Sequence, residues 1–461
     1  MKKSSIKALS DGFTDGGVGN TINFPGFFSH NISANLNCKK ISINERVAFE
    51  IAYGVSLSGK RSLVTMKNVG LNVAADPFLH SLLSGVNGGL VIVITEDVEV
   101  TASQERQDSR HYYNFFGGLW FEPSSLKSAY DIARRSFYLS EKYDVPIVIR
   151  LTNQFFNLHD NYVRLNKIKY KQKKIIKNPD KYIIYPNYWE KQYFNLKQKN
   201  NKIINFTEEF LDYLPQKSIK NNTKGLIMAG NCWKEYSIKK YNEWDKLLIE
   251  TYPIPAKKVQ KFIEGKKEIV VLEQGDSFVY EKVSRLISKK NSELSILSNT
   301  GSAPNLSSKW IVWNNLYKLF IALKSIGPSF VVGDVGQFTV ESVHVINSCL
   351  CLGSAVGTGI GLVLGGIKYP FCITGDTSFL HSGIQALIEA QSRNIAMGVI
   401  VIDNDGSAST GGQKLISSIY DVNKNIVKIT IDYSKTSKTT IKDILTKMQV
   451  ENKLAILYVK I

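Results

Sequence analysis

The sequence has few cysteines and no long apolar run near its start. Its five cysteines are odd in number and lack the spacing of paired metal-finger ligands, which argues against a disulfide framework and a zinc-binding module. Lys2 and Lys3 precede no apolar stretch of about seven residues, so a secretory signal is not indicated. We therefore expect a reducing, cytoplasmic setting.

Acidic residues are scarce relative to basic ones, with 40 Asp and Glu against 58 Lys and Arg and a net charge of +18. Half of this surplus lies in residues 160–224, where 15 Lys and Arg accompany 6 Asp and Glu. Lysines interleaved with tyrosines can bind single-stranded nucleic acid, but a solvated surface connector has the same composition. We interpret the stretch as a connector and expect no nucleic-acid partner.

Long uncharged runs are few, and one of them is long enough to be considered as a membrane-spanning segment. Residues 347–367 carry no charge, and Gly353, Gly357, Gly361 and Gly365 recur every fourth residue, a spacing that lets membrane helices approach closely. A glycine-striped helix packed on a sheet has the same pattern, and the flanking segments are charged and globular in character. We therefore expect no membrane-spanning segment.

Buried strands alternate with helices along most of the chain. Runs such as LVIVIT (residues 90–95) lack polar alternation, which is typical of strands buried on both faces of a parallel sheet. A length of 461 residues indicates about three domains of this α/β kind. The expected strands are residues 62–66, 89–95, 146–152, 225–230, 268–273, 330–334, 371–374, 397–402, 427–433 and 454–461, and the expected helices are residues 44–58, 74–83, 123–143, 232–248, 277–288 and 381–393.

One strand–helix–strand unit, residues 371–413, carries polar residues where both of its strands end. Gly375-Asp376-Thr377 follows the first strand, and Asp403-Asn404 follows the second. Ligands of open parallel sheets bind at the carboxyl ends of the strands, so Asp376 and Asn404 are expected to face one crevice. Their oxygens suit Mg²⁺, which keeps positions for substrate phosphates and water. Two ordinary strand-end turns would give the same residues without a ligand.

This spacing resembles the thiamine diphosphate motif, in which Gly-Asp-Gly is followed some thirty residues later by Asn. Further segments occur in matching order, and together they resemble the alpha subunit of indolepyruvate ferredoxin oxidoreductase. The resemblance spans almost the whole chain and is weakest in residues 161–222. The segments are INERVAFE (residues 43–50), VTMKNVGLNVAADP (64–77), SQERQDSRHY (103–112), EPSS (122–125), GDVGQFTV (333–340) and CLCLGSAVG (349–357).

The resemblance implies an α/β protein with three doubly wound domains of the thiamine diphosphate-binding fold. These are a pyrimidine-binding domain over residues 1–160, a transketolase C-terminal-like domain over 223–306 and a diphosphate-binding domain over 307–461, with the basic connector over 161–222. Thiamine diphosphate and Mg²⁺ are the implied cofactors, and thiamine diphosphate would lie between the first and last domains. A homodimer and a small-molecule 2-oxo acid substrate are implied as well.

Residue by residue, the resemblance assigns Glu45 to the glutamate that bonds N1′ of the aminopyrimidine. A place near the start of an apolar helix suits a carboxyl group whose pKa is raised by desolvation, although an acid there can also simply stabilise the helix dipole. Asp376 and Asn404 match the metal ligands, with the Gly406 carbonyl as the expected third, and Leu352 matches the apolar residue that holds the cofactor bent. The other implied cofactor contacts are Gly333, Asp334, Gly353, Ser354, Gly375, Thr377 and Ser378.

Three more residues are candidates for contact with the substrate. His381 matches a histidine that follows the Gly-Asp turn and is the expected proton-transfer or substrate-orienting group, although a histidine at a helix start is often structural. Arg110 and Lys67 match positions that can meet a substrate carboxylate. Surface ion pairing is the alternative for both.

The chain also departs from the family in segments that handle substrate and electrons. WIVWNN (residues 310–315) replaces an expected Cys-Pro-Gly-Cys motif, and Asn68 stands where histidine is expected. Phe24-Pro25-Gly26-Phe27-Phe28 replaces an expected Tyr-Pro-Gly-Thr-Pro, which removes a hydroxyl group expected close to the substrate. No cysteine follows Cys372, so we expect no iron–sulfur cluster in this chain.

Our leading hypothesis from the sequence is therefore a non-oxidative 2-oxo acid decarboxylase or carboligase that works through an enamine intermediate. The first alternative is the catalytic subunit of a 2-oxoacid ferredoxin oxidoreductase whose iron–sulfur carrier resides on a redox partner subunit. The second is a non-catalytic cofactor-binding subunit, which the retained Glu45 disfavours.

Overall fold

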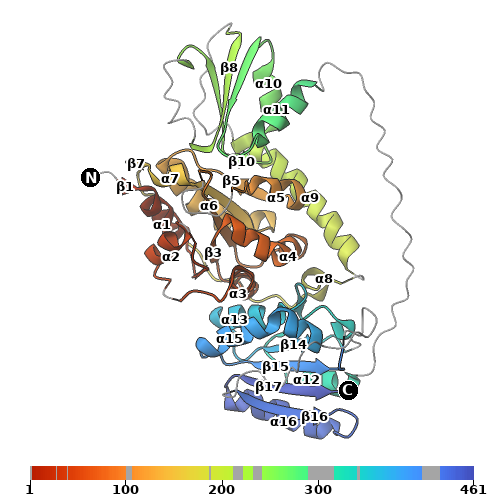
Figure 1. The fold of residues 1–461 in the computed structure, drawn as a ribbon. Coiled ribbons are helices and arrows are strands. Elements are labelled where there is room, and N and C mark those ends of the chain that lie inside the picture. The colour runs from red at the N-terminus through yellow and green to blue at the C-terminus, as the bar shows by residue number, and fades with distance from the viewer. Residues whose placement is uncertain are drawn as a thin grey trace.

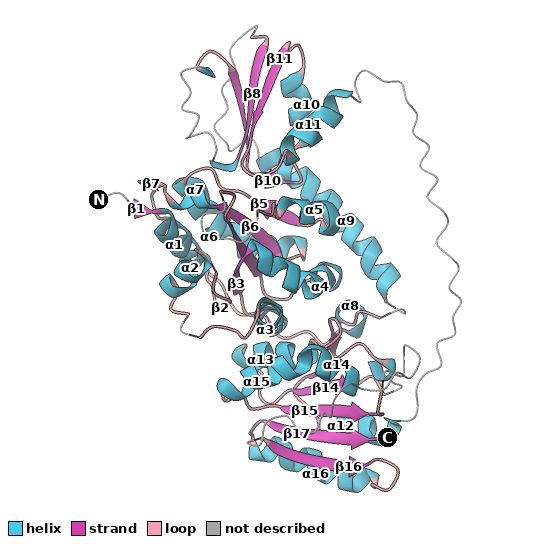
Figure 2. Ribbon diagram, in the orientation of Figure 1, coloured by secondary structure: helices cyan, strands magenta, loops and turns pink. Residues whose placement is uncertain are grey.

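In the computed structural model, the described residues form three sheets of mainly parallel strands and one short antiparallel pair (Figures 1 and 2). The six-stranded sheet of the first domain lies between the three-stranded middle sheet and the six-stranded C-terminal sheet. The expectation of an α/β fold with parallel sheets is confirmed. The structure describes residues 3–26, 28–38, 40–99, 106–185, 188–210, 222–231, 241–288, 316–339, 343–406 and 426–461.

The first sheet has the strand order β10-β5-β6-β4-β3-β2. Its central strands consist mainly of β-branched and other apolar residues and are buried on both faces, as their lack of polar alternation predicted. The edge strand β10 comes from the middle of the chain and pairs antiparallel with β5. The strands are β2 (Asn20–Asn23), β3 (Ser62–Lys67), β4 (Leu90–Glu96), β5 (Leu119–Phe121), β6 (Ile147–Thr152) and β10 (Thr251–Tyr252), and a separate pair joins β1 (Lys3–Ser4) to β7 (His159–Asp160).

Capping residues set the ends of the main helices of this domain. The Asn44 side chain accepts a hydrogen bond from the Val47 N–H at the start of α3, and Ser125 does the same for the Ser128 N–H at the start of α6. Asp144 ends α6 in the left-handed conformation. The helices are α1 (Ser5–Asp15), α2 (Ser29–Asn35), α3 (Glu45–Leu57), α4 (Asn68–Ser84), α5 (Arg110–Phe116), α6 (Leu126–Tyr143) and α7 (Asn153–Phe156).

The C-terminal sheet is parallel throughout, in the order β13-β12-β14-β15-β17-β16. A π-helical turn, η6 (Phe379–Gly383), interrupts the helix that follows β14. The strands are β12 (Val331–Gly333), β13 (Ser348–Cys349), β14 (Phe371–Gly375), β15 (Gly398–Asp403), β16 (Val427–Asp432) and β17 (Ala455–Lys460), and the helices are α12 (Tyr317–Ser325), η5 (Gln337–Thr339), α13 (Ala355–Leu364), α14 (Asp376–Ser378), α15 (Ile384–Ser392) and α16 (Lys438–Glu451).

The middle sheet has three parallel strands, β11 (Glu268–Leu272), β8 (Lys224–Ala229) and β9 (Asp245–Ile249), accompanied by α10 (Ala256–Ile263) and α11 (Phe278–Ser288). The prediction of a helix over residues 232–248 is wrong at its C-terminal end, because residues 245–248 belong to β9. Short apolar runs fit either periodicity, and here pairing with β8 decides for a strand. Residues 232–240 lie outside the described residues.

The basic connector packs against the first domain instead of lying wholly in solvent. It contains α8 (Pro179–Tyr182) and the long helix α9 (Trp189–Phe210), which runs beside α4 (Figure 1). The α9 side chains Leu196, Ile203, Phe206 and Phe210 are buried. Just after α8, Ile183 pairs with Cys349 of the C-terminal sheet. The connector therefore contacts two of the sheet-containing parts, and the interpretation as solvated surface is incomplete.

Two glycines of the stripe, Gly357 and Gly361, lie on α13, where a close helix crossing explains them. A Cβ atom on Gly361 would lie 2.0 Å from the Ile51 carbonyl oxygen, and one on Gly54 would lie 2.1 Å from the Thr358 carbonyl oxygen. Glycine at both positions thus lets α3 and α13 meet backbone to backbone. Among the described residues, no helix has the length and apolar character needed to cross a membrane.

Candidate functional site

Three strand ends of the C-terminal sheet place the predicted polar residues along one edge. β14 pairs in parallel with both β12 and β15, so Gly333, Gly375 and Asp403 end neighbouring strands. The Asp376 carboxylate oxygen Oδ2 accepts hydrogen bonds from the backbone N–H groups of Asn404 and Gly406, both at 3.1 Å. The two halves of the motif therefore meet through Asp376.

Asp376 is buried and its carboxylate is well supplied with donors. Its Oδ1 accepts from the Thr377 N–H at 2.5 Å and from the Thr377 hydroxyl at 3.2 Å. The Asp376 carboxylate, the Asn404 side-chain amide and the Gly406 carbonyl would offer hard oxygen donors, the type of ligand that Mg²⁺ prefers. A cation bound here would share the two Asp376 carboxylate oxygens with the four hydrogen bonds that they already accept. The metal-ligand roles of these residues stay a prediction.

Asp334 directly follows β12, and its side chain lies at the start of α13. One of its two carboxylate oxygens is a spare hydrogen-bond acceptor. Its Oδ1 accepts from the Ala355 N–H at 2.9 Å, whereas Oδ2 is buried with no hydrogen-bond partner among the described residues. Burial raises the pKa of this carboxyl group to about 6. An unpartnered buried oxygen fits a site that a polar ligand completes.

The loop before α13 is held in one tight conformation. Gly353 has a φ of 83°, and a Cβ atom there would lie 1.8 Å from the Ser382 hydroxyl oxygen. The Ser354 hydroxyl donates to the Cys351 carbonyl at 2.7 Å. Leu352 is half-buried in this loop. Leu352, Gly353 and Ser354 are thus fixed against the π-helical turn that contains His381.

Glu45 is the first residue of α3 and is half-buried. Burial raises the pKa of its carboxyl group, which is the direction required of a glutamate that must hold a proton. Gly70 in α4 faces it, since a Cβ atom at Gly70 would lie 2.5 Å from the Glu45 Cγ atom. Any side chain at position 70 would displace the carboxyl group.

Arg46 joins α3 to the loop before α13. Its Nη2 donates to the Leu352 carbonyl at 2.5 Å and lies 3.3 Å from the Cys351 Sγ atom, while its Nε donates to Glu50 Oε1 at 2.9 Å. Burial raises the pKa of Glu50 to about 8, although Arg46 opposes this. The motif-based analysis missed Arg46 and Glu50, whose i,i+4 spacing on a predicted helix was an available signal.

Asp76, His80 and Cys351 form a cluster of metal-ligand type, with ligand atoms within 4.8 Å of one another. The Arg46 guanidinium lies against two of them, at 3.2 Å from Asp76 Oδ2 and 3.3 Å from Cys351 Sγ. A positive charge is therefore already present at this place, and the cluster belongs to the junction of α3, α4 and the loop before α13.

His381 lies in the π-helical turn η6, and its Nδ1 is 3.2 Å from the Ser382 hydroxyl oxygen. The sequence predicted an α-helix starting at this residue, whereas helical structure begins earlier, at Asp376. Its side chain is exposed, but partial desolvation and the charge of Arg46 lower its pKa. The imidazole is therefore neutral near pH 7 and can accept a proton.

Arg110 lies elsewhere, in a buried ionic network between the first and middle domains. Its Nη1 donates to Glu273 Oε2 at 2.8 Å, its Nη2 donates to the Gln274 carbonyl at 2.8 Å, and its Nε and Nη2 bind Asp108. The side chain is 0% exposed. These contacts give Arg110 a structural role, so its predicted role toward substrate has no support in the described geometry.

Lys67 ends β3 and precedes α4. Its side chain is half-buried and lies against Gly26, where a Cβ atom would be 3.0 Å from that of Lys67. Among the segments that depart from the family, Phe28 stacks on Phe156 with ring centroids 4.2 Å apart, while Phe27 and residues 310–315 lie outside the described residues. A substrate role for Lys67 stays a prediction.

Comparisons with known proteins agree with the motifs. The family described as thiamine pyrophosphate enzyme, C-terminal TPP binding domain, matches residues 334–452. Indolepyruvate oxidoreductase subunit IorA of Archaeoglobus fulgidus is 26% identical, over 88% of this chain and 75% of that protein. IorA of Methanothermobacter thermautotrophicus is 24% identical, over 87% and 74%.

Solved structures of thiamine diphosphate enzymes share the fold at low sequence identity. Benzoylformate decarboxylase from Polynucleobacter necessarius has a TM-score of 0.53 at 14% identity, covering 100% of this chain and 98% of that one. A thiamin diphosphate-dependent enzyme described as putative, from Mycobacterium smegmatis, has a TM-score of 0.52 at 12% identity, covering 99% of each chain. The predicted fold and the predicted family resemblance are both confirmed.

Proposed function

We propose that this chain, a thiamine diphosphate-dependent, 2-oxoacid oxidoreductase-like protein, is the cofactor-holding catalytic subunit of an indolepyruvate-type oxidoreductase. It would decarboxylate a 2-oxo acid, and the two electrons left when CO₂ departs would pass to an iron–sulfur carrier on a partner subunit. The two relatives that align with 88% and 87% of this chain are named oxidoreductase subunits. Their names favour this alternative over our leading non-oxidative hypothesis. The observation that carries the proposal is the meeting of the Glu45 helix, through Arg46, with the loop before α13.

The residues present fit the cofactor. Asp376, Asn404 and Gly406 would hold Mg²⁺, and the spare acceptor of Asp334 lies where a polar group of the ligand can complete it. When bound, thiamine diphosphate supplies the electron-accepting ring that permits loss of CO₂ from a 2-oxo acid. The other residues proposed to line its diphosphate end are Gly333, Gly353, Ser354, Gly375, Thr377 and Ser378.

Glu45 would hold a proton at its carboxyl group and donate it as a hydrogen bond to a ring nitrogen of the aminopyrimidine. Its raised pKa favours the protonated form that this requires. Gly70 leaves the space that the carboxyl group occupies. Leu352, held by Arg46 through its carbonyl group, would offer the cofactor an apolar contact.

His381 would move a proton at the reacting carbon or orient the substrate. Its lowered pKa keeps the ring neutral and able to accept a proton near pH 7. The positive charge of Arg46 adds to the effect of desolvation in lowering that pKa. Lys67 remains the candidate for the substrate carboxylate.

The test is anaerobic release of CO₂ from indole-3-pyruvate and from aliphatic 2-oxo acids, by chain supplied with thiamine diphosphate and Mg²⁺. We expect release only with an artificial electron acceptor, and none from Glu45→Gln in either condition. Release without an acceptor, abolished in Glu45→Gln, would instead establish the non-oxidative decarboxylase or carboligase.

A further inference from the structure

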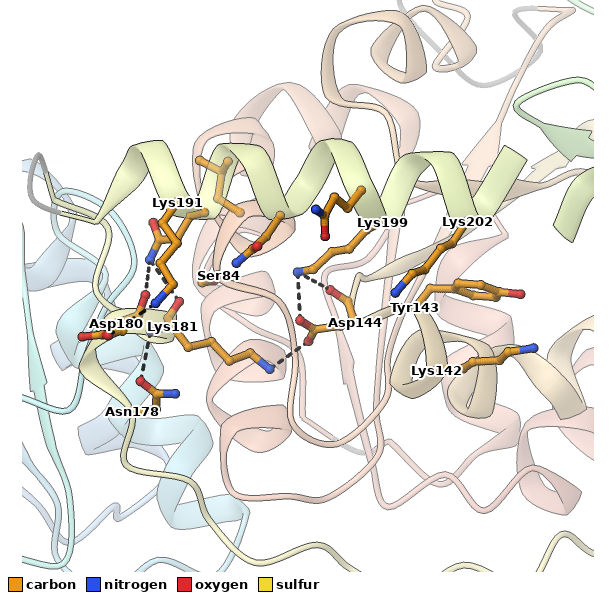
Figure 3. Close-up of a pocket in the computed structure, with 14 residues that line it drawn as sticks. Ser84, Lys142, Tyr143, Asp144, Asn178, Asp180, Lys181, Lys191, Lys199 and Lys202 are labelled. Carbon is orange, nitrogen blue, oxygen red and sulfur yellow. Dashed lines mark hydrogen bonds and ion pairs between the residues drawn. The ribbon is translucent and has the colours of Figure 1, made fainter. Parts of the chain in front are cut away.

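A cavity of about 400 Å³ lies away from the proposed cofactor site, between the connector and the first domain (Figure 3). Helix α9 forms one wall, the start of α8 another, and the end of α6 the third. Its lining is rich in lysine and in uncharged hydrogen-bonding side chains. The charged lining residues are Lys142, Lys181, Lys191, Lys199, Lys202, Asp144 and Asp180.

Two of these lysines converge on one carboxylate. Lys181 Nζ lies 2.9 Å from Asp144 Oδ1, and Lys199 Nζ lies 2.8 Å from Asp144 Oδ2 (Figure 3). The lysine side chains are only 28% and 15% exposed. One carboxylate therefore offsets two partly desolvated ammonium groups, and one positive charge remains in excess. Burial lowers the pKa of Lys199, whereas Asp144 raises that of Lys181 in spite of burial.

The Asp144 carboxylate is held in place by backbone contacts, so it does not pair with the other lysines of the cavity. It has a φ of 55°, and its Oδ1 also accepts from the Val86 N–H at 2.9 Å. Gly85 touches the same group, since a Cβ atom there would lie 2.4 Å from Oδ1. Lys181 Nζ donates to the Val86 carbonyl and Lys199 Nζ to the Asp144 carbonyl, so both ammonium groups are fixed in place.

The remaining lysines leave the rim positive. Lys191 lies 3.7 Å from Asp180, but both side chains are mostly exposed, and such a pair contributes little. Lys142 and Lys202 add two further exposed cations from α6 and α9. Five lysines against two aspartates therefore line one polar cavity.

We propose that this cavity binds a compact small molecule that carries two or more phosphate groups. The excess positive charge favours a polyanion, and a cavity of about 400 Å³ has the size of a small-molecule site. Asn178, Asn195 and Gln198 add uncharged donors and acceptors for the rest of the ligand. Because Ile183, just after α8, pairs with the C-terminal sheet, bound ligand would join the connector to the first domain next to that contact.

The probe is inorganic triphosphate, titrated calorimetrically into chain already saturated with thiamine diphosphate and Mg²⁺, so that the cofactor site is not available. The pocket variant is Lys142→Gln/Lys191→Gln/Lys202→Gln, which spares the two lysines bound to Asp144. The control is Lys438→Gln/Lys442→Gln/Lys447→Gln, three exposed lysines of α16 whose loss changes the net charge equally.

We expect one saturable site whose Kd rises about tenfold in the pocket variant and stays unchanged in the α16 variant. A Lys202→Gln single variant, which removes one exposed charge, should shift Kd in the same direction with an unchanged circular dichroism spectrum. No saturable binding to wild type, or an equal loss in both triple variants, overturns the proposal. Displacement of triphosphate by a single-stranded oligonucleotide at lower concentration would replace it with a nucleic-acid partner.

Discussion

Replacement of Arg110 by methionine removes a buried guanidinium but keeps an apolar chain of similar length. The loss leaves Glu273, at 8% exposure, without its ion-pair partner, and leaves Asp108, at 0% exposure, with only the more distant Arg150 at 3.8 Å. Breaking a buried pair by removing one partner costs about 3–5 kcal/mol. At a few degrees per kcal/mol, the melting temperature of the unit that contains this network should fall by roughly 10 °C. Arg106→Met is the matched control, because its pair with Asp276 is about half exposed and should contribute less than about 1 kcal/mol.

The assay is differential scanning calorimetry of both variants together with their KM for a 2-oxo acid. The ion pairs lower the pKa of Asp108, against the effect of burial. This stabilisation is therefore present above the unfolded pKa of about 4 and is lost as the pH falls below it. The difference between wild type and Arg110→Met should accordingly shrink in acid. An unchanged melting temperature with a large rise in KM would refute this reasoning and would support a role for Arg110 in substrate binding.

Three further predictions concern the proposed cofactor site and the helix crossing. Glu45→Gln should lower the rate of CO₂ release by about 100-fold or more without changing the melting temperature, and an active variant would exclude Glu45 as the proton-holding group. Asp376→Asn should raise the Kd for thiamine diphosphate measured with Mg²⁺ by tenfold or more, since a charged hard ligand is lost; equal affinity would argue against a metal at this residue. Gly361→Ala should destabilise the chain by about 1–3 kcal/mol in urea unfolding, because its Cβ atom would lie 2.0 Å from the Ile51 carbonyl; a neutral result would mean that α3 and α13 separate easily.

Periodicity and strand-end chemistry predicted most of the elements at the proposed site. The unbroken apolar runs of β4 and β15 predicted buried parallel strands, and the polar residues after β14 and β15 predicted their meeting at one edge. The helix of residues 74–83 was expected to begin at 74, yet α4 starts at Asn68 and continues through Pro77. Tertiary packing sustains that helix in spite of its proline.

Other features depend on contacts between residues far apart in the chain. The burial of Arg110 arises from carboxylates and carbonyl groups of Glu273 to Asp276, more than 160 positions away. No local pattern marks such a partner, so the sequence could not predict this network. The π-helical turn at His381 likewise has no periodicity signal, because a single wide turn leaves the pattern on either side unchanged.

Because of the edge strand β10, the first sheet is not built from one continuous segment of the chain. Thr251 and Tyr252 belong in sequence to the middle region but close the first sheet by pairing with β5. Deleting the middle region would therefore expose the unpaired edge of β5, together with the buried Glu122 carboxylate that Arg150 holds and that the Tyr252 hydroxyl bonds. Separate expression of the sheets would yield aggregation-prone pieces, and any natural split or fusion of the chain has to keep residues 251–252 with the first domain.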